Sequence, residues 1–249
     1  MTAPERAPLG AALALLLMLV SLTGALSPLL MALAVALLAL LIGIAWPTLL
    51  ELPSALGTRI VVIAAGVLGA LASIVAPERV PAISAVVMVC AVGVFASFAH
   101  QMVRRDRRGL TASLTGTVAG VFVSALAATW VIAQANAVEH GGTSLITAIA
   151  AGLGATLLLD ATSLPGRLRF TLSAVAGTAV TAVLAVVLAG ISPLLAVPVG
   201  LVTAIAAASA HLLVGSSLVA KEPVPSLAVA AVPVATVGVL AHLVVTLLP

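Results

Sequence analysis

The stretch PLLMALAVALLALLIGIAW, residues 28–46, contains no charged side chain. A run of this length approaches the roughly 20 apolar residues that an α-helix needs to cross a bilayer. Similar runs recur along nearly the whole chain and are separated by short turns that contain proline, glycine or charge. The pattern predicts an all-α, polytopic integral membrane protein.

The composition supports this fold class. Of the 249 residues, 63% are hydrophobic and only 7% are charged, whereas soluble domains carry about 25% charged residues. Nine or ten spans would use nearly the whole chain, so we expect one membrane domain over residues 1–249. Cys90 is the single cysteine, which excludes an intramolecular disulfide and a multi-cysteine metal site. The basic residues are scattered and form no basic face, so we expect no nucleic-acid partner.

Span boundaries follow from proline, glycine and charge, because the residue before a proline disfavours helix and charge disfavours the bilayer core. The predicted spans lie near residues 9–26, 28–46, 58–76, 80–103, 110–133, 145–159, 168–190, 193–219 and 224–247. This count of about nine is tested by the rule that positive charge beside short loops stays cytoplasmic.

With the N-terminus cytoplasmic and the C-terminus external, every basic residue except Arg79 falls on the cytoplasmic side. Merging or splitting one span would scatter the arginines over both faces. We therefore expect a multi-pass protein of a cell membrane, of the bacterial plasma membrane type. An alternative takes the first 27 residues as a cleaved signal peptide, since Arg6 precedes an apolar core; the close second span and the charge pattern favour a retained helix.

Four histidines and a few carboxylates are the candidates for chemistry. His140 and Glu139 lie together in a polar stretch, but they provide too few ligands for zinc, and an external loop is the simpler interpretation. His211 and His242 lie inside apolar spans, where an ionisable group is a hypothesis for function; we expect backbone or hydroxyl groups of neighbouring helices to satisfy them. Every acidic residue lies at a span end or in a loop, which argues against a proton pump. No metal or cofactor is predicted.

The strongest polar feature is a predicted cytoplasmic patch that binds lipid, phosphate or a partner. Guanidinium groups match phosphate geometry, although the arginine cluster at 104–108 also suits a topology signal. The patch consists of Arg104, Arg105, Arg107, Arg108, Asp160, Arg167 and Arg169, with Lys221 and Glu222 nearby. A second feature is a face of small residues, Gly116, Gly120 and Ser124, whose spacing of four permits close helix packing.

The order of these features resembles the phosphatidate cytidylyltransferase family, membrane enzymes that make CDP-diacylglycerol from CTP and phosphatidic acid. Asp160, Gly166 and Arg167 match a shortened form of that family's Asp-Thr-x-Ala-Tyr-x-x-Gly-Arg stretch, without its tyrosine. The family's signature before the last span, which holds metal through carboxylates, has no counterpart in residues 215–226, where no aspartate occurs. Nucleotidyl transfer with two metal ions needs several carboxylates. The resemblance therefore implies a family member that kept the fold and lost the chemistry.

From these features we expect a non-enzymatic membrane protein, a regulatory or scaffolding partner of another membrane protein in lipid or envelope synthesis. Its expected partners are membrane lipids and another membrane protein or a second copy, with an active cytidylyltransferase as one option. Two alternatives stay open: a lipid-linked nucleotidyl or phosphoryl transferase that uses Asp160 and the arginines, and a small carrier of a lipidic or apolar substrate.

Overall fold

The computed structural model describes residues 7–23, 26–75, 81–105, 107–140, 142–160, 162 and 164–248. Arg6 and Arg79 of the predicted charge pattern, Asp106 of the arginine cluster and Gly141 lie outside these residues. The described residues form ten α-helices and a short 3-10 helix, η3 (Leu218–Lys221). The α-helices are α1 (Ala7–Ser21), α2 (Ser27–Leu49), α3 (Ala55–Val75), α4 (Ala82–Val103), α5 (Leu110–Leu126), α6 (Thr129–Glu139), α7 (Ser144–Asp160), α8 (Gly166–Ala189), α9 (Pro193–Gly215) and α10 (Pro225–Leu247).

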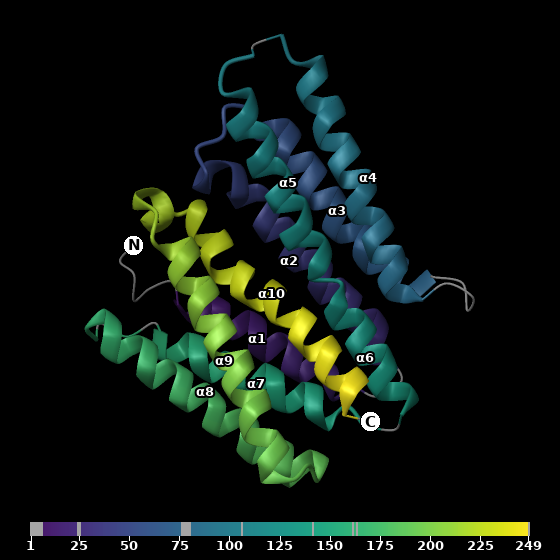
Figure 1. Cartoon of the computed structure of the whole chain (residues 1–249), viewed down its shortest axis with the longest axis vertical. Helices are drawn as coiled ribbons and strands as arrows, with labels where there is room; N and C mark the ends of the chain where they lie inside the picture. The colour runs from purple at the N-terminus through teal and green to yellow at the C-terminus, as the bar shows by residue number, and fades with distance from the viewer. Residues whose placement is uncertain are drawn as a thin grey trace.

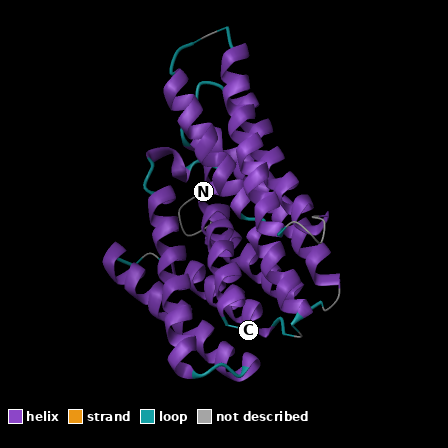
Figure 2. Cartoon of the chain, turned by 45° about the vertical axis from the view of Figure 1, so that its right-hand side comes forward, coloured by secondary structure: helices purple, strands orange, loops and turns teal. Residues whose placement is uncertain are grey.

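Local sequence explains where several helices begin and end. Proline occupies one of the first two positions of α2, α9 and α10, where its missing N–H removes no helical hydrogen bond. Helix α8 is followed directly by Gly190, which has a φ of 66°, a left-handed conformation that glycine adopts without a steric penalty. Figure 2 shows that helix makes up nearly all of the described chain and that the links are short.

The architecture is that of a multi-pass helical membrane protein. Within the described residues, seven helical segments are long and apolar enough to cross a membrane, and α5 and α6 together form one of them, Leu110–Glu139. Two further apolar helices are shorter, α1 with 15 residues and α7 with 17 residues. The predicted fold class is thereby confirmed at the level of a helical protein with many candidate spans.

The fifth predicted span differs most from the structure. We expected it to end at residue 133 and to be followed by a polar loop, but the helix breaks at Ala127 and Ala128 and then continues as α6 to Glu139. Gln134 lies inside α6 and is fully buried, and its Nε2 donates to Ser27 Oγ at 2.7 Å. The polar side chain is compatible with a helix because α1 and α2 provide its partners. The eighth predicted span also ends earlier, at Gly215 instead of residue 219.

The bundle has inner and outer helices. Buried residues make up more than half of the apolar windows of α2, α5–α6 and α10, but a third or less of those of α3, α4, α8 and α9. Figure 1 shows α3, α4 and α5 together in the upper part of the molecule and α7, α8 and α9 in the lower part, with α10 crossing between them. Helix α4 is the most exposed of the candidate spans, because the described chain covers few of its apolar side chains.

The predicted small-residue face is used inside the chain. Gly116 faces Leu52, Gly120 faces Trp46 and Val62, and a side chain on Gly66 of α3 would overlap Ser124. The Trp46 indole Nε1 donates to the Gly116 carbonyl at 2.7 Å. Because α2 and α3 occupy this face, it is not available to a second protein.

Candidate functional site

Asp160 is the last residue of α7 and is only 3% exposed. A carboxylate at this position faces two unfavourable effects. It loses hydration through burial, and it lies at the negative end of the helix dipole. If Asp160 is ionised in this setting, its charge requires cationic partners.

The first partner is Arg169, in the opening turn of α8. Its Nε lies 3.3 Å from Asp160 Oδ1, and its side chain is 28% exposed. Helices α7 and α8 approach closely because Gly152 faces the backbone of Gly177 and the side chain of Thr181. This close approach places the end of α7 beside the beginning of α8, and hence the carboxylate beside the guanidinium.

The second partner is His211, one turn before the end of α9. Its Nε2 lies 3.6 Å from Asp160 Oδ2. The backbone of Val229 in α10 lies beside the imidazole, and Val229 lines the same cavity. Pro233 lies four residues after Val229 inside α10, and because proline has no N–H, the Val229 carbonyl has no helical donor. The proline therefore leaves a backbone acceptor for a group on the neighbouring helix.

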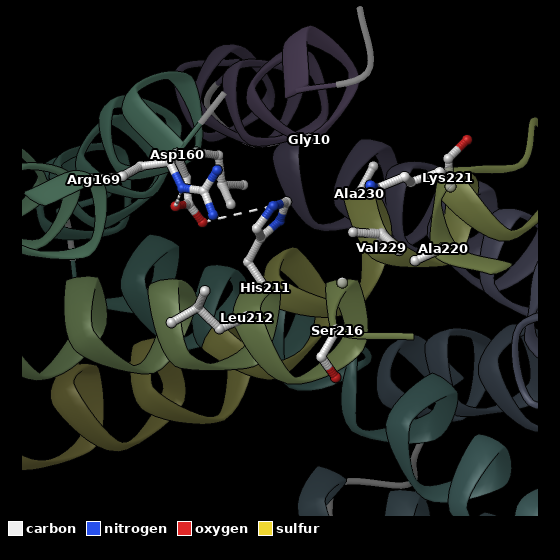
Figure 3. Close-up of a pocket in the computed structure, with 13 residues that line it drawn as sticks. Gly10, Asp160, Arg169, His211, Leu212, Ser216, Ala220, Lys221, Val229 and Ala230 are labelled. Carbon is white, nitrogen blue, oxygen red and sulfur yellow. Dashed lines mark ion pairs between the residues drawn. The ribbon is translucent and has the colours of Figure 1, made fainter. Parts of the chain in front are cut away.

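These side chains line a cavity of about 330 Å³ where α1, α7, α9 and α10 meet. In Figure 3, Asp160 and Arg169 lie on the left side of the cavity and Lys221 of η3 lies on the right side. His211 lies between the two sides. Ser216 and Ser226 add hydroxyl groups, and the rest of the lining is apolar: Gly10, Leu157, Leu212, Gly215, Ala220, Val229 and Ala230. The cavity thus combines two permanent cations and one carboxylate with an apolar wall.

Several polar atoms in this cavity have no hydrogen bond within the described chain, and all of them except the histidine nitrogen take part in an ion pair. They are both carboxylate oxygens of Asp160, Nε of Arg169 and Nδ1 of His211. Buried polar groups are nearly always hydrogen-bonded in folded proteins. This concentration of unfilled hydrogen-bonding capacity in one cavity is what a site for a polar ligand requires.

The structure divides the predicted cytoplasmic patch into two parts. Asp160 and Arg169 form an ion pair, and Lys221 lines the same cavity. Arg167 is exposed in the first turn of α8 and is not among the lining residues. The arginines at 104–108 lie at the link between α4 and α5, at the top of Figure 1, and none of them lines the cavity.

His211 is the functional candidate that sequence reasoning undervalued. We expected backbone or hydroxyl groups to satisfy it, whereas the structure pairs it with Asp160, and nothing local in the sequence relates α7 to α9. The available signals were an ionisable residue in an apolar span and a proline in the following helix. His140, by contrast, has a local role, since its Nδ1 lies 2.7 Å from the Asn136 carbonyl at the end of α6.

Comparison of the chain with protein-family models, with curated proteins and with solved structures finds no match. The resemblance to the cytidylyltransferase family accordingly stays a prediction. Among the described residues, no three His, Cys, Asp or Glu side chains are grouped as metal ligands would be.

Proposed function

We propose that the chain crosses a cell membrane nine times, with a cytoplasmic N-terminus and an external C-terminus. The seven long candidate spans and the shorter helices α1 and α7 would supply these crossings. Helices of 15 and 17 residues rise by about 22 and 26 Å at 1.5 Å per residue. This is less than a bilayer core of about 30 Å, a mismatch that local thinning of the bilayer accommodates.

We further propose that the protein is non-enzymatic and binds an acidic membrane lipid in the cavity beside Asp160. The observation that carries this proposal is the combination of Arg169, His211 and Lys221 with a mostly apolar lining. Guanidinium and ammonium groups bind phosphate oxygens, while the apolar wall suits the first carbons of a lipid chain. With a neutral imidazole, the two cations and one carboxylate leave a net positive charge, which favours an anionic head group.

Binding of lipid by a protein without catalytic machinery fits a regulatory or scaffolding role beside another membrane protein of lipid or envelope synthesis. Since α2 and α3 cover the face of Gly116 and Gly120, such a partner would dock on the outer helices. Affinity purification of the tagged protein from native membranes tests this role, and the absence of any lipid- or envelope-synthesis enzyme from the purified material would remove its basis.

The lipid site is tested by measuring bound phosphatidic acid and phosphatidylglycerol after reconstitution of the purified chain. Lys221→Gln removes an exposed cation of the cavity without breaking the Asp160 ion pair, so we expect about three- to tenfold weaker binding. Arg169→Gln should weaken binding further. Arg167→Gln is the matched control, because it removes a charge from the same turn of α8 but outside the cavity. Equal binding by the Lys221 and Arg167 variants would refute the site.

A transferase is the second candidate, because the Asp160–His211 pair could orient an imidazole for general acid–base work. This function predicts turnover when the protein is incubated with CTP, Mg²⁺ and phosphatidic acid, and loss of that turnover in Asp160→Asn. Such a result would replace the non-enzymatic proposal, whereas lipid binding without product would support it.

A further inference from the structure

The arginine cluster between α4 and α5 lies outside the cavity and is built differently. Arg104 is partly buried at the end of α4, whereas Arg105, Arg107 and Arg108 are exposed. A hydrogen-bonded chain holds Arg104 in place. Its Nη1 donates to Gln101 Oε1 at 2.8 Å, and Gln101 Nε2 donates to Ser113 Oγ of α5 at 2.9 Å.

This anchor is itself buried, since Gln101 is 3% exposed and Ser113 is fully buried. The amide is satisfied on both its donor and acceptor sides, which fixes its orientation. A topology signal needs only charge and no such support. Holding a guanidinium in one place lowers the entropy cost of binding a ligand to it.

An exposed apolar stripe leads along α4 to the arginines. Met88, Phe95 and Met102 are 67%, 76% and 78% exposed, and their spacing of seven places them on one face of the helix. Val92 and Phe98 lie beside them and are also exposed. A cationic cluster at the end of such a stripe complements a lipid, whose phosphate meets the arginines while its acyl chain lies along the helix.

We propose that the α4–α5 turn is a second site for an anionic phospholipid, independent of the cavity, and that Gln101 positions Arg104 in it. The bound group is a lipid phosphate, recognised by guanidinium geometry and retained by contact of the acyl chain with the α4 stripe. Gln101 does not touch the lipid and acts through Arg104. The site does not depend on the function proposed for the Asp160 cavity.

Photocrosslinking locates this site separately from the cavity. The full chain is reconstituted in phosphatidylcholine nanodiscs with a trace of phosphatidylglycerol that carries a diazirine in its acyl chain, and crosslinked peptides are mapped by mass spectrometry. We expect crosslinks on residues 88–102. Changing all four arginines to lysine should lower them about five- to tenfold, because ammonium groups lack the forked donors. Arg167→Lys, an exposed arginine of α8, is the control and should leave them unchanged.

A double-mutant cycle tests the role of Gln101. Gln101→Leu should reduce the crosslinks several-fold in the natural chain and have little further effect when Arg104 is already lysine. Equal reduction in both backgrounds would show that Gln101 acts on folding and not through Arg104. If Gln101→Leu does not fold, the variant with all four arginines changed to lysine still tests whether a lipid binds at this turn.

Three results would overturn the proposal. The first is unchanged crosslinking in the four-lysine variant. The second is equal crosslinking by a photoreactive phosphatidylcholine, which lacks net charge. The third is full displacement by soluble glycerol phosphate, which would mean that the turn binds phosphate without the α4 stripe.

Discussion

At Asp160, burial and the helix dipole both disfavour a negative charge, so the residue depends on its neighbours for compensation. Arg169 and His211 share this compensation: Arg169 lies at 3.3 Å and carries a permanent charge, whereas His211 lies at 3.6 Å and is charged only when protonated. The asymmetry between the two partners makes the ion pair sensitive to the loss of the arginine.

We therefore expect Arg169→Leu to destabilise the protein more than Asp160→Asn. The leucine variant leaves a buried carboxylate without its permanently charged partner, at a cost of about 2–3 kcal/mol, the lower part of the usual 2–5 kcal/mol range, because Arg169 reaches solvent. Asparagine leaves only a partly exposed arginine unpaired. Thermal unfolding in detergent measures both effects. The double variant should be more stable than Arg169→Leu alone, and the opposite order would mean that the carboxylate is not stabilised by this pair.

At the scale of elements, the α7–α8 pair positions the site through glycine. A methyl group on Gly177 would lie 2.9 Å from Ala204 Cβ and 3.0 Å from the Gly152 carbonyl, and would overlap the Thr156 hydroxyl. These contacts are too short for real side chains, so an added methyl must push α8 away from α7 and α9.

Gly177→Ala should cost about 1–3 kcal/mol through overpacking and should also weaken lipid binding in the cavity, since Asp160 and Arg169 lie on these two helices. Gly166→Ala is the control, because among the described residues no atom outside its chain neighbours and its own helix lies within 4 Å of the added methyl group. Unfolding temperature and lipid binding are compared in both variants. If Gly177→Ala matches the control in both measurements, close α7–α8 contact is not what forms the site.

Helix α10 contributes a second element-scale effect through Pro233. Pro233→Ala restores an N–H that occupies the Val229 carbonyl, the backbone acceptor beside His211 in the cavity wall, so lipid binding should fall about two- to fivefold, or roughly 0.5–1 kcal/mol, the size of one hydrogen bond. Pro198→Ala is a matched control, since Pro198 also lies inside a helix but its replacement restores a donor to the carbonyl of Leu194, which is not in the cavity. Similar loss in both variants would point to general helix flexibility.

For the whole molecule, the proposed topology predicts which links are reachable from each side. In a chain whose Cys90 has been replaced by alanine, single cysteines at residues 107 and 167 should be labelled from the cytoplasmic side. A cysteine at residue 140 should be labelled from outside. A membrane-impermeant maleimide, applied separately to intact cells and to inverted vesicles, distinguishes cysteines on the two sides of the membrane. Labelling of residues 107 and 140 from the same side would exclude the nine-span arrangement.

The sequence by itself determined the membrane class and most helices, because a run such as residues 28–46 can satisfy its backbone in lipid only as a helix. It also located most boundaries, through proline, glycine and charge. It misplaced the end of the fifth span because the polarity of Gln134 indicated a loop, while its partners lie on α1 and α2. Local sequence carries no information about such distant partners.

For the candidate site too, the sequence identified some residues and the tertiary structure decided how they are arranged. Asp160, Arg169 and the arginine cluster were identifiable from their charge at span ends, and the face of Gly116, Gly120 and Ser124 from its spacing. Only the tertiary structure decided that this face packs within the chain, that the arginines at 104–108 lie apart from Asp160, and that His211 joins it. The physical reason is that the helix period fixes which residues share a face, but the packing of α7, α8, α9 and α10 fixes which faces meet.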